Sequence, residues 1–162
     1  MKRLQYWVTG VVLAWALCGL AVAGEHQRFT VHEDGTVTDR LLNVMWGTRD
    51  NHGNIDWQGA QRWVRLTFPY SLPREKREGW RLPTLRELQS LYVDDAGYEG
   101  YETDCGQWVR IVPEIKLSCG WVWASEKEAI SARVFNFQRG YHYTDRRVHN
   151  RGYRALAVKN LK

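Results

Sequence analysis

Apolar and polar residues alternate along several segments of the chain, which is the pattern of half-buried β-strands. In residues 29–39 the alternation continues on both sides of Asp34-Gly35, a dipeptide typical of tight hairpin turns. Further strand-like runs occupy residues 44–46, 121–124, 133–137 and 153–158. The pattern therefore predicts a β-hairpin near the start of the domain and several strands toward its end.

The first predicted helix spans about residues 57–67. It follows Asp56, whose carboxylate is suited to cap a helix N-terminus. Four apolar residues at helical spacing define its buried face: Trp57, Ala60, Trp63 and Val64.

The second predicted helix spans about residues 84–93 and has a clearer start. Thr84 and Glu87 have the Thr-x-x-Glu spacing of a capping box. Its apolar stripe consists of Leu85, Leu88, Leu91 and Tyr92. The residues before it read as extended, because Pro83 disfavours helix at the preceding position, and we expect Arg81 to pair with a carboxylate. Strands on either side of two helices predict a single domain of the α+β class.

The first 23 residues have the features of a bacterial-type signal peptide. Lys2 and Arg3 form a positive start, residues 7–20 are mostly apolar, and Ala21-Val22-Ala23 is a small-x-small cleavage motif. The apolar run is short for a membrane span, which needs about 20 residues, and an uncleaved anchor helix is the alternative. We expect cleavage after Ala23, a domain of residues 24–162 located in the periplasm or the medium, and no membrane span after cleavage.

Signal cleavage would leave two cysteines, Cys105 and Cys119, because Cys18 lies in the signal. Exported proteins meet an oxidising environment, so we expect a disulfide between them. The bridge would close a loop of about 15 residues and contribute about 3 kcal/mol to stability. A redox-active pair is the alternative, but the spacing is not Cys-x-x-Cys.

The composition is that of a globular domain and contains no signature of catalysis. Hydrophobic residues make up 44% of the 162 positions and charged residues 25%, with 9 Trp and 8 Tyr that can provide flat contact surfaces. The motifs of serine hydrolases, zinc proteases, P-loop proteins and dinucleotide enzymes do not occur. The acidic stretch 94–104 could bind calcium, but its spacing matches no known loop. We therefore expect neither an enzyme, a cofactor nor a metal.

The segment 139–154 is the most informative for function. It contains five Arg and one Asp, interleaved with Tyr and His, in a chain of formal net charge +5. Arg forms planar hydrogen-bonded pairs with sulfate and phosphate, and Tyr stacks on sugar rings. The alternative is a hairpin with a solvated basic edge. The predicted ligand-binding residues are Arg139, Tyr141, His142, Tyr143, Arg146, Arg147 and Arg151.

The expected ligand of this segment is an anionic glycan or another component of the cell envelope. We predict that Arg146, Arg147 and Arg151, with Tyr141 and Tyr143, contact a sulfated or phosphorylated polysaccharide. Phosphates of an anionic membrane are a variant of this idea, and export disfavours nucleic acid. The alternative function is an envelope domain with a structural or protein-interaction role, for which an exposed tryptophan patch would argue.

Several segments resemble the Lcl C-terminal domain family of bacterial proteins. The most specific is Trp80-Arg81-Leu82-Pro83-Thr84-x-x-Glu87-Leu88. The others are residues 34–39, 44–46, Asp56-Trp57 with Ala60, and Trp123-Ala124-Ser125 with 134–137 and Gly140. The resemblance implies a C-type-lectin-like fold, with two helices packed on a small irregular antiparallel sheet. It also implies placement outside the cytoplasm and, for its best-known members, binding of sulfated polysaccharide. Val64 and Ala155 stand where family members often have cysteines.

Overall fold

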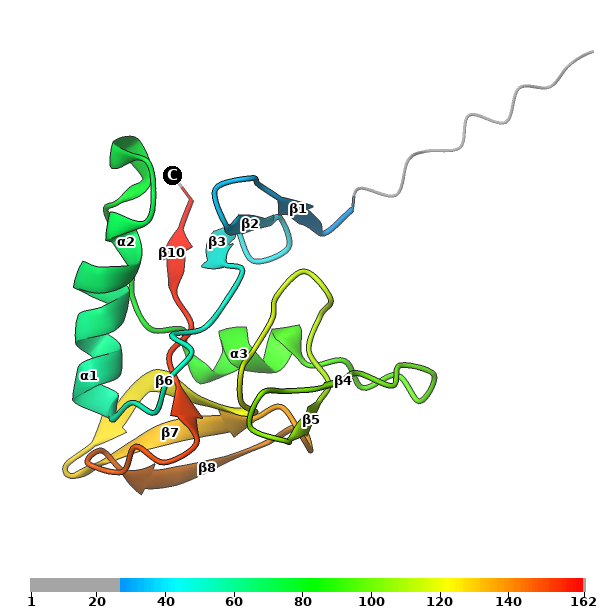
Figure 1. Ribbon diagram of the computed structural model, residues 1–162, viewed down its shortest axis with the longest axis vertical. Coiled ribbons are helices and arrows are strands. Elements are labelled where there is room, and N and C mark those ends of the chain that lie inside the picture. The colour runs from blue at the N-terminus through cyan, green and yellow to red at the C-terminus, as the bar shows by residue number, and fades with distance from the viewer. Residues whose placement is uncertain (1–26, 162) are drawn as a thin grey trace, which may run out of the picture.

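The computed structural model describes residues 27–161, so the predicted signal peptide lies outside the described residues. The described chain is α+β, as expected, with two four-stranded sheets, a small two-stranded hairpin and two main helical segments (Figure 1). None of the helices within residues 27–161 has the length and apolar character needed to cross a membrane.

The first sheet joins the beginning of the described chain to its end. Its strand order is β1-β2-β3-β10 and every pairing is antiparallel. Its strands are β1 (Phe29–Val31), β2 (Thr36–Asp39), β3 (Val44–Gly47) and β10 (Val158–Asn160). The turn between β1 and β2 contains Asp34 and Gly35, and Gly35 has a φ of 80° that favours glycine. The predicted hairpin is therefore confirmed.

The second sheet contains two strands from the segment that the sequence marks as basic, residues 139–154. Its order is β8-β7-β6-β9, and β9 runs parallel to β6 while the other pairs are antiparallel. Its strands are β6 (Trp121–Glu128), β7 (Ser131–Asn136), β8 (Tyr141–Arg146) and β9 (Tyr153–Arg154). A separate hairpin pairs β4 (Tyr101–Glu102) with β5 (Trp108–Val109).

The predicted strand 153–158 is divided between the two sheets, which corrects the expectation of one antiparallel sheet. Residues 155–157 leave β9, cross the interior and enter β10, and all three are fully buried. Their backbone is bonded to the segment at and after the end of β3: the N of Gly47, the last residue of β3, donates to Ala157 O at 2.9 Å, and the N of Asn51 in the following loop donates to Ala155 O at 3.2 Å. The apolar sequence of residues 155–157 predicts that they are buried, but it does not predict which segment their backbone bonds to.

The first helical segment consists of α1 (Trp57–Arg62), a π-helical turn η1 (Trp63–Thr67) and α2 (Phe68–Tyr70). Asp56 caps it as predicted, because its Oδ1 accepts from Gly59 N at 2.6 Å. The segment extends three residues beyond the predicted end. Pro69 lacks an N–H and its ring crowds the carbonyl four residues earlier, which explains why Phe68 N bonds to Trp63 O, five residues back.

The second helix, α3 (Leu85–Leu91), has the predicted capping box formed by Thr84 and Glu87. It ends before Tyr92, which is extended and forms a bridge with Ile111. A short 3₁₀ turn, η2 (Arg74–Lys76), lies between the two helical segments. Arg81 pairs with Glu87 as expected, through Nη1–Oε2 at 2.8 Å and Nη2–Oε1 at 2.7 Å.

The hydrophobic core has two parts, one on each side of the second sheet. Leu88 and Leu91 of α3 belong to the part that includes Phe135. The other part includes α1 and five tryptophans: Trp57, Trp80, Trp123 and the half-buried Trp63 and Trp121. Val64 and Ala155, which stand where the resemblance implies cysteines, are both fully buried in this second part and fill it with apolar side chains.

We predict that Glu87→Gln destabilises the fold by about 2 kcal/mol, because charge-assisted hydrogen bonds of this kind contribute about 1.5–3 kcal/mol. Although burial alone raises the pKa of Glu87, hydrogen bonds from Arg81 and Thr84 lower it below its ordinary 4.5. The stabilisation is therefore complete above the unfolded pKa and is lost as the pH falls through the folded pKa. Urea unfolding of both proteins across this acidic range measures it. The exposed Glu99→Gln is the control, and an equal effect of both changes would contradict the prediction.

Candidate functional site

A cleft of about 450 Å³ opens beside the Cys105–Cys119 disulfide. The disulfide confirms the predicted pairing, with the two Cα atoms 5.4 Å apart. Cys119 is buried and Cys105 is exposed, so the bridge ties a surface loop to the interior. The cleft is lined by Asn54, Cys105, Gln107, Cys119, Trp121, Arg151 and Gly152. No carboxylate is among these residues, so the charged side chain that borders the cleft is a cation.

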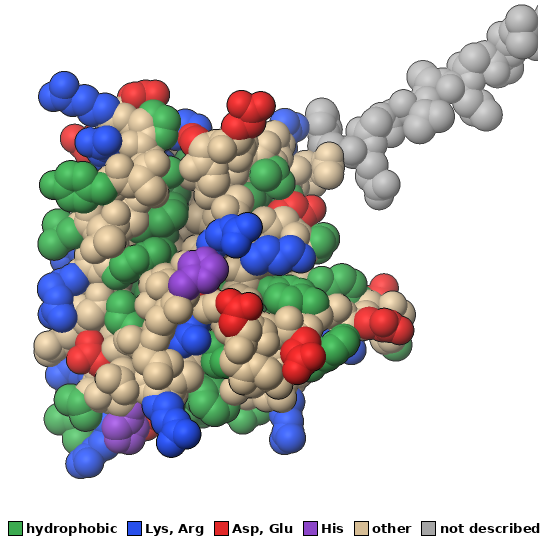
Figure 2. Space-filling view, in the orientation of Figure 1, with side chains coloured by type: hydrophobic (Ala, Val, Ile, Leu, Met, Phe, Trp, Pro, Cys, Tyr) green, Lys and Arg blue, Asp and Glu red, His purple; other side chains and the backbone are tan. Residues whose placement is uncertain are grey.

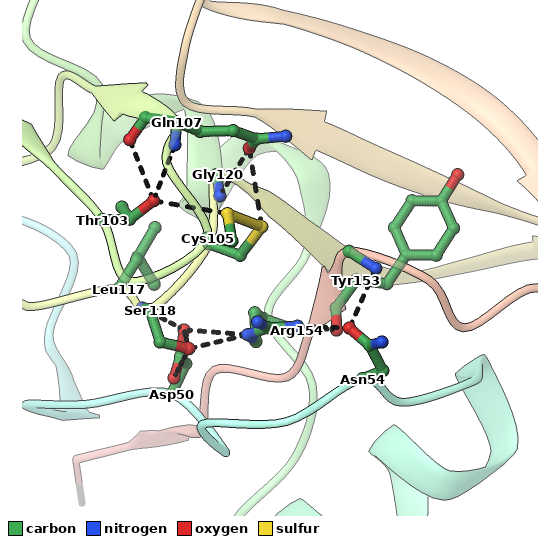
Figure 3. The surroundings of a disulfide bond; sticks show 12 residues. Asp50, Asn54, Thr103, Cys105, Gln107, Leu117, Ser118, Gly120, Tyr153 and Arg154 are labelled. Carbon is green, nitrogen blue, oxygen red and sulfur yellow. Dashed lines mark hydrogen bonds and ion pairs between the residues drawn. A yellow bond between two sulfur atoms is a disulfide. The ribbon is translucent and has the colours of Figure 1, made fainter.

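Two amide side chains present hydrogen-bond donors to this cleft. Gln107 Oε1 accepts from Gly120 N at 2.9 Å, and Asn54 Oδ1 accepts from Gly152 N at 3.0 Å. These bonds fix the oxygen of each amide, and neither NH₂ group has a hydrogen-bond partner within residues 27–161. Figure 3 shows the Gln107 amide beside the disulfide and the Asn54 amide beside Arg154, each with its nitrogen turned away from the dashed bonds. The cleft therefore offers donors to a ligand that is rich in acceptor oxygens.

Trp121 supplies the aromatic wall of the cleft and packs closely against the loop that carries Arg151. A Cβ atom on Gly152 would lie 3.0 Å from the Trp121 ring, and Gly152 has a φ of +82°, so only glycine suits this position. Trp121 is half-buried, and its Nε1 is buried without a hydrogen-bond partner. The close approach at Gly152 thus sets Arg151 beside an indole ring.

A buried ion pair lies behind the cleft and is bonded to Asn54 of its lining and to Ser118, the neighbour of Cys119 (Figure 3). Arg154 Nε lies 3.8 Å from Asp50 Oδ2 and donates to Ser118 Oγ at 2.7 Å. Asp50 accepts from Ser118 N at 2.7 Å and from Ser118 Oγ at 2.9 Å. Arg154 Nη1 also donates to Asn54 Oδ1 at 3.1 Å. Arg154 is only 6% exposed, so this arginine of the basic segment is a structural residue.

Strand β8 divides the predicted binding residues between the two faces of the second sheet. Tyr143 lies opposite Val134 of β7, whereas His142 lies opposite Phe135, and side chains alternate along a strand. Tyr141 and Tyr143 therefore share one face, with ring centres 6.0 Å apart. His142 and Arg146 point to the opposite face. The structure does not bring all seven predicted residues together.

The tyrosine face continues into a chain of polar contacts. Tyr143 Oη donates to Tyr153 Oη at 3.2 Å, Tyr153 donates to Asp145, and His149 Nδ1 lies 2.8 Å from Asp145. Although burial alone raises the pKa of Asp145, the bonds from Tyr153 and His149 hold it below its usual range. Burial and the bond to Asp145 raise the pKa of Tyr153. The Asp145 carboxylate, which is close to the arginines in the sequence, is thus already bonded by Tyr153 and His149.

A second hollow, of about 310 Å³, lies on the other side of Arg151. It is lined by Asp145, Val148, His149, Asn150, Arg151 and Tyr153. Arg151 therefore borders both hollows and is the predicted residue with the most open surroundings. Arg147 lies elsewhere, with its guanidinium carbon 5.6 Å from the centre of the Trp57 ring, and Arg139 is exposed in the turn between β7 and β8.

Sequence reasoning missed three residues of the cleft: Asn54, Gln107 and Trp121. Trp121 was assigned only to a strand, and its place beside Gly152 follows from the parallel pairing of β6 with β9. Asn54 and Gln107 lie in loops, where single polar residues give no local signal. Within residues 27–161 there is no group of three or more His, Cys, Asp or Glu side chains that could hold a metal ion, the acidic stretch 94–104 included.

We predict that Asp50→Asn destabilises the protein by about 3 kcal/mol, because it leaves Arg154 buried without its counter-charge. Thermal unfolding followed by circular dichroism measures the loss. The double change Asp50→Leu/Arg154→Met removes both charges and should recover part of it, since paired replacement of a buried ion pair is often tolerated. A wild-type melting temperature for Asp50→Asn would show that the ion pair does not stabilise the segments behind the cleft.

The family model of the Lcl C-terminal domain matches residues 35–159. This range includes the second sheet, both helical segments, the cleft and most of the first sheet, whose strand β1 lies before it. No curated protein matched the chain. Because the match covers far more than half of its length, the chain belongs to the Lcl C-terminal domain family.

Proposed function

We propose that this domain is an exported, non-enzymatic binding module for an anionic polysaccharide, sulfated or phosphorylated, on a cell surface or in the cell envelope. The observation that carries the proposal is the cleft beside the disulfide. There an arginine, two amide NH₂ groups and an indole ring border one opening without a carboxylate. Aromatic faces stack on sugar rings, and arginine and amide donors bind sulfate and hydroxyl oxygens.

The position of Arg151 connects this cleft with the segment that the sequence singled out. Arg151 also borders the second hollow, whose floor includes Tyr153 and the edge of β8. Tyr141, 47% exposed, lies on the same face of the sheet as Tyr143. A chain-like ligand could extend from the cleft past Arg151 toward the tyrosines, which is the reason for proposing a polysaccharide rather than a single sugar.

The proposal also includes a C-type-lectin-like fold. It is supported by the family membership and by the topology. The first and last strands, β1 and β10, lie in the same sheet, and both helical segments lie between β3 and β4 in the sequence.

The alternative function, an envelope domain with a protein partner, would be favoured by an exposed patch of tryptophans. Among the seven tryptophans of residues 27–161, four are buried, two are half-buried and Trp108 is 50% exposed.

The binding prediction is that Arg151→Gln weakens heparin binding about tenfold, since charge-assisted contacts are worth about 1.5–3 kcal/mol. Tyr141→Ala should weaken it less. Isothermal titration with heparin fragments measures the affinity, and affinity should fall as salt is raised.

Arg146→Gln is the matched control, because Arg146 carries the same charge on the opposite face of β8. It should bind heparin nearly as well as the wild type. A loss for Arg146→Gln that equals the loss for Arg151→Gln would mean a diffuse charge effect and would contradict the cleft. Equal affinity of all three proteins, with unchanged melting temperatures, would reject the proposed function at this surface.

Export has its own test. We predict that protein recovered from the periplasm or medium of producing cells begins at Gly24, as Edman sequencing or intact mass would show. The reason is the small-x-small motif that ends at Ala23. Protein found only in the membrane fraction with Met1 or Lys2 at its terminus would identify an anchor instead of a cleaved signal.

A further inference from the structure

The outer side of the first helical segment combines exposed apolar and basic side chains. Leu66 is 59% exposed and Tyr70 is 76% exposed, which is high for such large apolar groups. Arg62, Arg65 and Arg77 are exposed around them. We call these five residues the basic–apolar ridge. Figure 2 shows Lys, Arg and hydrophobic side chains gathered along the edge where Figure 1 places α1 and α2.

The ridge exists because the opposite side of the same segment is anchored in the core. Trp57, Ala60 and Val64 share the buried face, so the side chains on the opposite side of the segment, about half a turn away, must face solvent. The π-helical turn adds a residue to this helix just before Pro69. Such turns are frequent at functional sites. Here the turn contains both Arg65 and Leu66 of the ridge.

The helical part of the ridge carries charge of one sign, since residues 57–73 contain no Asp or Glu. The nearest acids in sequence are Asp56 at the N-cap and the exposed Glu75 and Glu78, which lie on either side of Arg77. Arg65, Leu66, Pro69, Tyr70 and Arg77 surround a hollow of about 250 Å³ without a carboxylate. Within residues 27–161 the guanidinium groups of Arg62 and Arg65 form no hydrogen bond or ion pair, so their donors remain available.

Two contacts fix the Arg77 side chain beside the apolar residue Tyr70 of the ridge. Its Nε donates to Leu72 O at 2.9 Å, and its guanidinium carbon lies 5.7 Å from the centre of the Tyr70 ring. The two terminal nitrogens of Arg77 are not used by these contacts. The arrangement places a fixed cation next to a tyrosine that projects from the surface.

We propose that the basic–apolar ridge docks this domain on an anionic lipid surface. Leu66 and Tyr70 would enter the interfacial region of the bilayer, where tyrosine is favoured, and Arg62, Arg65 and Arg77 would bind lipid phosphates. The ridge shares no residue with the cleft, so this inference is independent of the proposed glycan binding. Docking through this edge would leave the cleft free for its own ligand.

The shape and charge of the ridge favour a lipid surface over a protein partner or a soluble anion. Its apolar residues are two side chains on one helix, spaced by four positions, and they project between cations. This is the pattern of interfacial helices, which combine shallow apolar insertion with attraction to anionic headgroups. A soluble anion would need only the arginines and would gain nothing from the exposure of Leu66 and Tyr70.

The test is co-sedimentation of the purified protein with phosphatidylcholine vesicles, with and without phosphatidylglycerol. We expect binding to the anionic vesicles and little to the neutral ones. Arg62→Gln/Arg65→Gln should reduce the partition coefficient more than tenfold, since each basic residue near an anionic surface contributes about fivefold. Leu66→Ser/Tyr70→Ser should reduce it comparably. Every variant has the same N-terminus, so differences between variants report on the ridge.

The matched control is Arg146→Gln/Val148→Ser, which removes one exposed cation and one exposed apolar side chain outside the ridge. It should bind vesicles like the wild type, and melting temperatures should show that all variants are folded. Arg151→Gln should weaken heparin binding about tenfold, as predicted above, and keep full vesicle binding, which separates this inference from the proposed function. Equal binding to neutral vesicles, an equal loss in the control, or full competition by glycerol phosphate would each overturn the inference.

Discussion

The buried ion pair of Asp50 and Arg154 joins three segments that are far apart in the sequence. It links the loop before α1, the residues that lead into β6, and β9, through Ser118 and Asn54. Residues in or next to each of these segments line the cleft: Asn54, Cys119, and Arg151 with Gly152 just before β9. Burying two charges costs desolvation energy that the pair alone does not fully recover. The additional hydrogen bonds to Ser118 and Asn54 offset this cost, and they also fix the orientation of the Asn54 amide.

Around this ion pair, the fold uses its two sheets for different tasks. The first sheet closes the domain by pairing strands from both ends of the described chain, and Arg81 strengthens this closure because it bonds both Glu87 of α3 and Asn160 of β10. The second sheet has core on both sides near β6 and β7, whereas β8 is an edge strand with exposed side chains. The exposed surfaces available for contacts are therefore the β8 edge of this sheet, the loop that follows β8, and the outer side of the first helical segment.

Charge that is concentrated in the sequence is not concentrated in space. The five arginines of residues 139–154 occupy five environments: a turn, the outer face of β8, the Trp57 ring, the cleft and the interior. The strand period of two separates Arg146 from its neighbour Arg147, and the ion pair with Asp50 removes Arg154 from the surface. Arg151 alone borders the cleft. The proposed glycan site and the basic–apolar ridge are thus two separate surfaces, each with its own aromatic or aliphatic residues beside its cations.

By itself, the sequence determined the features whose physics is local. The hairpin at Asp34-Gly35, the capping box of Thr84 and Glu87, the cap at Asp56 and the Arg81–Glu87 pair involve residues close together in the chain, so their spacing was sufficient. The Cys105–Cys119 bridge followed because only two cysteines remain beyond the predicted signal. Tertiary structure decided the rest: the division of residues 153–158 between two sheets, the burial of Arg154, and the meeting of Asn54, Gln107 and Trp121 at one cleft. These depend on partners up to about a hundred residues away, and the pairing of distant segments is set by the packing of the whole core and leaves no mark in the local pattern.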